Sequence, residues 1–159
     1  MIFAKSPEIQ EKLQGTWAEK TIHRTYAAIV EGVLNKPNDT ISSYLVESKA
    51  LKMHSGKNPE IGKKAVTHYK LIQQNPQFAL LDVTLDTGRK NQIRVHMSDI
   101  GHPVAGDKKY GAKTNPFGRL GLHAKSIRFT HPVTNEKMSF ECDMPFKFKQ
   151  LFADAVINK

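Results

Sequence analysis

The sequence has almost no cysteine and no long hydrophobic run. Cys142 is the only cysteine among 159 residues, which excludes a disulfide framework and a thiolate metal cluster and fits a reducing cytoplasm. No apolar run approaches the roughly 20 residues that a membrane-spanning helix needs. Residues 1–6 are too few and too soon charged to be a signal peptide, and their pattern is that of the end of a β-strand.

The seven histidines lack the spacing of a metal site. None belongs to an HExxH pattern, and none lies beside a carboxylate at ligand spacing on one helix face. No serine or cysteine occupies the sharp strand-to-helix turn of a hydrolase. We therefore expect no metal ion, and a metal-dependent hydrolase is kept only as an alternative. It would have to use the histidines of the second half, which are His96, His102, His123 and His131.

Positive charge is the dominant feature of the composition. There are 24 Lys and Arg residues against 15 Asp and Glu, which gives a net charge of +9. A basic surface of this size favours polyanions, of which RNA and DNA are the usual ones. A soluble protein with scattered lysines, or one that binds small acidic substrates, would have the same composition.

Alternating and helical patterns predict an α+β fold. We expect one domain, residues 1–159, with a mainly antiparallel mixed β-sheet and flanking helices. Strands are expected at residues 24–34, 40–47, 65–72, 78–87, 127–130 and 138–141, and loops at 54–64 and 111–121. Helices are expected after Ser6, after Gly88 and near the C-terminus. Their buried stripes would be Ile9, Leu13 and Trp17; Ile93, Met97 and Ile100; and Phe148, Leu151, Phe152 and Ala155.

The densest run of polar groups begins where a strand gives way to a helix. Residues 88–97 read Gly-Arg-Lys-Asn-Gln-Ile-Arg-Val-His-Met, and Gly101 and Pro103 end the helix. Such a junction favours an anionic ligand that accepts hydrogen bonds. Arg94 lies in an otherwise apolar turn, so it must reach water or a carboxylate. A structural ion pair, with Asp82, Asp86 or Asp107, is as good an interpretation as a role in an active site.

Tyr26 and the lysine-rich loops are candidates for contacts with a nucleic acid. Tyr26 lies beside two alanines, which leaves room for a planar base to stack on it, although a core tyrosine would have the same pattern. The basic loops are candidates for phosphate contacts, and a solvated charged face is the simpler interpretation of any single lysine. The residues of these loops are Lys57, Lys63 and Lys64, and Lys108, Lys109, Lys113 and Arg119.

Four segments, in order along the chain, resemble those of the RluA-like pseudouridine synthases. They are residues 24–32, which resemble the family's tyrosine strand, then 62–69, 88–111, and 122–124 with 129–134. The resemblance covers essentially the whole chain. It implies the C-terminal portion of a pseudouridine synthase catalytic domain, an enzyme that isomerises uridine in ribosomal or transfer RNA, with RNA as partner and with no metal or organic cofactor.

The same resemblance assigns roles to individual residues. Arg94 would pair with the family's nucleophilic aspartate, and Tyr26 would stack on the target base or deprotonate it. Asn91 departs from the family, which usually has histidine there. RNA contacts are expected from Arg89, Asn91, Gln92, His96, Lys63, Lys64, Lys108 and Lys109.

The aspartate motif of the family, His-Arg-Leu-Asp-x-x-Thr-Ser-Gly, has no counterpart in this sequence. We therefore expect a chain that is truncated before the nucleophile and inactive alone, with a non-catalytic RNA-binding module as the alternative. An incomplete sheet would leave an edge open, which would favour self-association or pairing with a partner chain.

Overall fold

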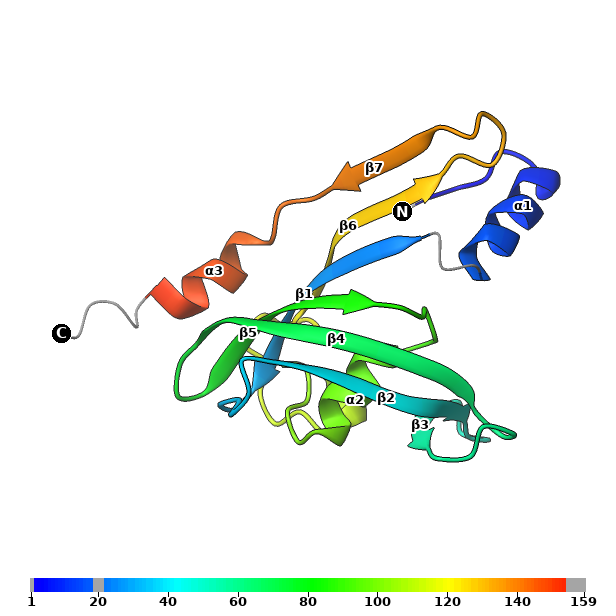
Figure 1. Cartoon of the computed structure of the whole chain (residues 1–159). Helices are drawn as coiled ribbons and strands as arrows, with labels where there is room; N and C mark the ends of the chain where they lie inside the picture. Colours follow the sequence, from blue (N-terminus) through cyan, green and yellow to red (C-terminus); the bar gives the residue numbers. More distant parts are fainter. Residues whose placement is uncertain (1, 19–21, 154–159) are drawn as a thin grey trace.

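In the computed structural model, residues 2–18 and 22–153 are described, and they form one antiparallel sheet of seven strands (Figure 1). The order across the sheet is β3-β2-β4-β5-β1-β6-β7. The strands are β1 (His23–Glu31), β2 (Asn38–Glu47), β3 (Met53–Gly56), β4 (Lys63–Gln74), β5 (Phe78–Leu85), β6 (Leu122–Thr130) and β7 (Lys137–Glu141). The helices are α1 (Pro7–Ala18), α2 (Gln92–Asp99) and α3 (Phe146–Ala153), with a short 3-10 helix η1 (Lys108–Tyr110). The predicted α+β fold is confirmed.

The central strands β1 and β5 divide the core into two layers. Tyr26 lies opposite Val83 and Ala28 lies opposite Leu81, so these four side chains share one face of the sheet. Helix α2 covers that face, and its buried Ile93 packs into the same cluster. The predicted apolar stripe of α2 is therefore confirmed, and it packs against the alternating residues of these two strands.

Helix α3 covers the opposite face of β1 and β5. Phe148 and Phe152 are almost completely buried there against Ile29 and Leu80. Burial of each phenyl ring contributes about 1.5–3 kcal/mol, which explains why so short a helix docks. Leu151 is half-buried, and Ala155 lies outside the described residues.

The far end of the sheet forms a separate small layer, in which α1 lies beside β6 and β7 (Figure 1). Leu13 of α1 packs with Ile22 and Phe129. Ser6 begins α1 as expected, since its hydroxyl accepts a hydrogen bond from the backbone N–H of Ile9 at 3.3 Å. The side chain of Trp17, which we expected in the same stripe, lies outside the described part.

One predicted loop contains a strand, and another strand begins earlier than predicted. Residues 53–56 pair with β2 as β3, and β6 begins at Leu122 rather than at residue 127. β3 is short and its central residues are polar, so its sequence has no alternating pattern. It is held by its pairing with β2 and by Met53, which is buried against Leu45 of β2 and against Tyr110 from a distant part of the chain. None of the described helices is long and apolar enough to cross a membrane.

Candidate active site

The site forms where β5 ends and the chain turns into α2. Asn91 precedes the helix with a φ of 55°, a left-handed conformation that asparagine tolerates better than most residues. Its backbone carbonyl accepts a hydrogen bond from Val95 at 3.0 Å, which starts the helix. Gly88 lies against the guanidinium of Arg24, which any side chain at that position would overlap.

Arg94 makes a bidentate ion pair with Asp107. Its Nε and Nη2 atoms each donate to one carboxylate oxygen at 2.7 Å. The side chain of Asp107 is 1% exposed and that of Arg94 is 23% exposed. The hydrogen bonds that Arg94 donates to Asp107 raise the pKa of Arg94 above its ordinary value, against the opposing effect of burial. Of the three possible partners, the structure selects Asp107.

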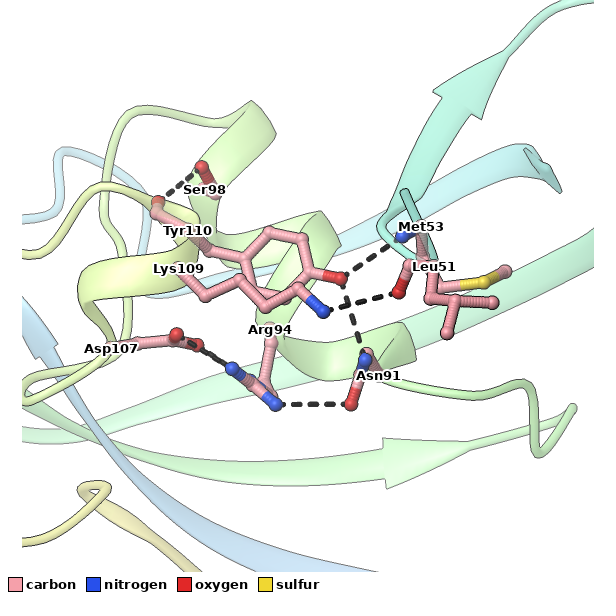
Figure 2. Close-up of polar contacts among 8 residues, drawn as sticks. All are labelled: Leu51, Met53, Asn91, Arg94, Ser98, Asp107, Lys109 and Tyr110. Atoms are coloured by element: carbon pink, nitrogen blue, oxygen red, sulfur yellow. Dashed lines mark hydrogen bonds and ion pairs between the residues drawn. The ribbon is translucent and has the colours of Figure 1, made fainter. Parts of the chain in front are cut away.

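Asn91 and Tyr110 complete the surroundings of this guanidinium (Figure 2). Nη1 of Arg94 donates to Oδ1 of Asn91 at 3.1 Å, and the guanidinium lies 4.9 Å from the centre of the Tyr110 ring. The phenol oxygen of Tyr110 accepts hydrogen bonds from the backbone of Met53 at 3.2 Å and from Asn91 at 3.4 Å. The guanidinium of Arg94 is therefore linked, through Asn91 and Tyr110, to the start of α2, to η1 and to β3.

Tyr26 and Arg94 line the same surface hollow of about 290 Å³. Its remaining walls are Leu85, Arg89, Asn91, Gln92, Ile93, Leu120 and Leu122. The hollow thus combines guanidinium groups, an aromatic ring and leucines, which suits a planar, partly anionic ligand such as a nucleotide. Tyr26 also lines a neighbouring hollow of about 460 Å³ with Arg24 and Lys125.

Gln92 and His96 need a correction, because both are buried: Gln92 is 2% exposed and His96 is not exposed at all. The amide of Gln92 donates to Val66 and Thr67 and accepts from Thr87. Although Gln92 forms part of the wall of the hollow, its amide nitrogen and oxygen are both engaged within the protein. The direct RNA contact that we expected is therefore not available to Gln92 or to the buried His96.

The imidazole of His96 lies between two strands of the sheet. Its Nδ1 shares a hydrogen bond with Thr67 at 2.8 Å and its Nε2 shares one with Ser43 at 2.9 Å. Burial lowers the pKa of His96, and the charge of Asp99 opposes this effect. The histidine therefore acts as a neutral bridge inside the core.

The four lysines expected to touch RNA are all exposed. Lys63 and Lys64 begin β4, and the backbone carbonyl of Lys64 accepts a hydrogen bond from Nε of Arg89 at 3.1 Å. Lys108 and Lys109 form η1, directly after Asp107. Their positions are compatible with phosphate contacts, which stay a prediction.

No carboxylate lines the hollow of Tyr26 and Arg94 in the part of the chain that the structure describes. Asp107 reaches Arg94 but is buried, while Asp82 pairs with Lys125 and Asp86 with His68. Within residues 2–18 and 22–153, no group of three or more histidines, cysteines and carboxylates is arranged to hold a metal ion.

Sequence reasoning assigned no role to Tyr110 and treated Asp107 as one candidate of three. Their spacing holds a usable signal, since a short turn between Gly106 and Gly111 presents both residues. Both glycines have positive φ angles, of 82° and 95°. A tyrosine and an aspartate fixed in so constrained a turn are candidates for a positioned pair.

Residues 1–99 match the family described as RNA pseudouridylate synthase, and the match includes both Tyr26 and Arg94. Among curated proteins, the uncharacterized RNA pseudouridine synthase YlyB of Bacillus subtilis is 37% identical over 152 residues, which covers 95% of this chain and 50% of the relative. Ribosomal large subunit pseudouridine synthase D of Haemophilus influenzae is 33% identical over 165 residues, with the same coverage of 95% and 50%. The chain spans about half the length of the curated relatives it matches.

Solved structures agree with the fold. The human RNA pseudouridylate synthase domain containing 1 superposes with a TM-score of 0.75 at 25% identity, over 90% of this chain and 63% of that one. The human domain containing 4 superposes with a TM-score of 0.72 at 22% identity, over 92% and 67%, which supports the fold alone.

Proposed function

The chain belongs to the RNA pseudouridylate synthase family, and from this premise we propose that it forms the Arg94 and Tyr26 side of an active site that isomerises uridine in RNA. The single observation that carries the proposal is the hollow these two side chains share, although they come from different elements. Family membership supports the proposed reaction, and the shared hollow supports the proposed position of the site.

The proposed reaction rearranges one nucleotide without oxidation or reduction. The bond between N1 of uracil and C1′ of ribose breaks, the base rotates, and a bond forms between C5 and C1′. C5 loses its proton and N1 gains one, so atoms and charge balance within the nucleotide and water. We accordingly propose that the reaction needs no metal or organic cofactor.

We assign the residues as follows. Arg94 holds the nucleophilic carboxylate ionised and oriented, a task that suits a planar guanidinium that is always charged. Tyr26 stacks on the target base or takes a proton from it. The base must leave the RNA stack to reach this hollow, at a cost of a few kcal/mol.

The RNA is proposed to be ribosomal, because several relatives carry the name ribosomal large subunit pseudouridine synthase D. Transfer RNA stays the other candidate. The exposed Arg89 and the half-buried Asn91 at the hollow, together with the two lysine pairs, would hold the phosphates. We also propose a cytoplasmic location, on cysteine content alone.

A second candidate function is RNA binding without catalysis. It is favoured by the hollow itself, which has no carboxylate within the described residues that could attack a nucleotide. On this basis we propose that the 159-residue chain does not turn over RNA by itself. Self-association through β7, which lies at one edge of the sheet, stays a prediction that light scattering would check.

The test is release of tritium from RNA labelled at C5 of uridine. The substrate is the large-subunit ribosomal RNA of Haemophilus influenzae, and two proteins are compared. One is the 159-residue chain; the other is a chimaera in which this chain replaces the matching half of the Haemophilus influenzae relative. We expect release by the chimaera only. Release by the chain alone would mean that one of its own carboxylates attacks, and no release by either would contradict the proposed activity.

Arg94→Lys in the chimaera tests the assigned role. The lysine keeps the charge opposite Asp107 but loses the planar fork, so we expect tritium release to fall by about 100-fold while RNA binding persists. Lys36→Arg is the matched control, since it exchanges the same two residue types at a surface pair with Asp39. Full activity of Arg94→Lys would remove Arg94 from the reaction.

A further inference from the structure

Arg94 is held on two of its sides. Its guanidinium has five N–H groups, and three hydrogen bonds engage Nε and Nη2 with Asp107 and Nη1 with Asn91. Within the described chain this leaves one N–H on Nη1 and one on Nη2 for another ligand. Because Arg94 also lines the hollow of Tyr26, the remaining donors are available to a group bound there.

Asp107 is the rigid member of the pair. Its backbone N–H donates to Val104 at 3.0 Å, and its carbonyl accepts from Tyr110 at 3.1 Å and Ala112 at 3.0 Å. Val104 in turn forms a bridge with Val30 of the central strand β1. The aspartate is thus fixed to the middle of the sheet, whereas a free arginine side chain has many rotamers that must be frozen.

Asn91 and Tyr110 limit the remaining motions of the guanidinium (Figure 2). The amide of Asn91 accepts from Nη1 and donates to the phenol of Tyr110, while the ring of Tyr110 lies near the guanidinium. Asn91 is held by its own left-handed backbone at the start of α2. We call Asp107, Asn91 and Tyr110 the guanidinium frame.

We propose that Asp107 is a positioning residue for the isomerisation: it fixes Arg94, with the help of the guanidinium frame, so that the two remaining N–H groups hold an anionic group in the hollow of Tyr26. The proposal rests on the proposed function, which supplies the anionic group as the attacking carboxylate. Asp107 itself does not touch the substrate, because it is buried and both of its oxygens are engaged by Arg94.

A merely structural pair would give different kinetics from a positioning pair. Loss of structure removes active molecules and lowers every rate in proportion to the folded fraction. Loss of positioning leaves a folded protein that binds RNA normally and reacts slowly, because a misplacement near 1 Å costs about 100-fold in rate. The split between kcat and KM separates the two.

The first measurement uses the 159-residue chain and does not depend on activity. Nitrogen NMR of the arginine Nε–H groups reports whether Arg94 is fixed. We expect Asp107→Asn to speed hydrogen exchange at this group by about tenfold or more, and Asp107→Glu to restore part of the protection. Asp82→Asn, at the surface pair with Lys125, should leave the Arg94 signal unchanged. Equal protection in the unsubstituted chain and in Asp107→Asn would overturn the proposal.

The second measurement is the kinetics of tritium release by the chimaera. We expect Asp107→Asn to lower kcat by about 100-fold with KM within about twofold, and Asp107→Glu to recover at least about tenfold. Asp82→Asn should keep full activity. A folded Asp107→Asn chimaera with an unchanged kcat would overturn the proposal, as would a loss that appears only in KM.

The two measurements keep the failure of each idea distinct. If the unsubstituted chimaera releases no tritium, the proposed function fails, and the fixing of Arg94 by Asp107 is judged from the NMR result alone. If the chimaera is active and Asp107→Asn is folded and fully active, the proposed function stands and the positioning role fails. Should Asp107→Asn not fold, Asp107→Glu decides, since positioning requires its kcat to lie below that of the parent.

Discussion

Helix α2 carries two polar residues, Arg94 and His96, that belong to the same polar run of the sequence but have opposite surroundings in the structure. Arg94 is charged, lines a hollow and is bound by a carboxylate. His96 is neutral, fully buried and bridged by the hydroxyls of Thr67 and Ser43. The first arrangement leaves donors for a ligand, whereas the second uses both ring nitrogens inside the protein. Polar density therefore marks a site only where hydrogen-bonding capacity is left over.

The largest effect should come from breaking the ion pair between Arg94 and Asp107. Arg94→Ala leaves the carboxylate of Asp107 buried without its partner, and we expect a loss of about 3–5 kcal/mol in the free energy of unfolding. Urea denaturation of the 159-residue chain measures it. The double variant Arg94→Ala, Asp107→Ala should lose less than the sum of the two single variants, because it removes both charges. A single-variant loss below about 1 kcal/mol would show that the pair is not important for stability.

Substitutions of Tyr26 test whether the hollow that it lines with Arg94 binds RNA. We expect Tyr26→Ala to weaken binding of a uridine-containing oligonucleotide by about 1–3 kcal/mol, because the stacking surface is removed. Tyr26→Phe should keep the affinity and, in the chimaera, lose any proton transfer that needs the phenol oxygen. Fluorescence anisotropy measures the affinity. An unchanged affinity in Tyr26→Ala would reduce this residue to a packing role in the core of β1.

The buried His96 is tested through the pH dependence of the free energy of unfolding. Burial lowers the pKa of His96, so the unfolded chain binds this proton more readily than the folded chain does, and acid favours unfolding. Stability should therefore fall as the pH drops below about 6.5, by at most about 1.4 kcal/mol per pH unit for one proton. Urea denaturation at a series of pH values measures the slope. His96→Gln should flatten it.

The control for this experiment is His54→Gln, at an exposed position of β3. It should leave the slope as it is. RNA affinity provides a second contrast, because His96→Gln should leave it within about twofold while Tyr26→Ala does not. A pH slope that is equal in the His96→Gln variant and the parent would show that another group carries the acid sensitivity.

The apolar side of α2 was predictable and its polar side was not. The period of two in β1 and β5 and the spacing of Ile93 and Met97 identify the residues that pack together, because both patterns are local. The partners of His96 lie on β2 and β4, far away in sequence, so no local pattern predicts that their hydroxyl groups bond to its ring. The same limit left Arg94 with three possible aspartates, since only the fold brings Asp107 to it.

The smallest effects should come from the exposed lysines, which we expect to act as independent, additive phosphate contacts. The double variant Lys108→Ser, Lys109→Ser in the 159-residue chain should reduce the slope of log affinity against log salt concentration by about 1.4 for single-stranded RNA, or about 0.7 for each phosphate that is no longer neutralised. The change should be independent of RNA sequence, because phosphates carry none. Anisotropy titrations at several salt concentrations measure the slope.

Lys63→Ser, Lys64→Ser is the parallel experiment at the start of β4, and Lys36→Ser, at a surface pair with Asp39, is the control. Equal slopes in the parent and in one double variant would remove that pair from the RNA path. If both pairs lower the slope and Lys36→Ser does not, the path includes η1 and the start of β4. Arg89 lines the hollow and donates to the carbonyl of Lys64, and Lys108 follows Asp107, the partner of Arg94. The RNA path would therefore pass on both sides of the residues that fix Arg94.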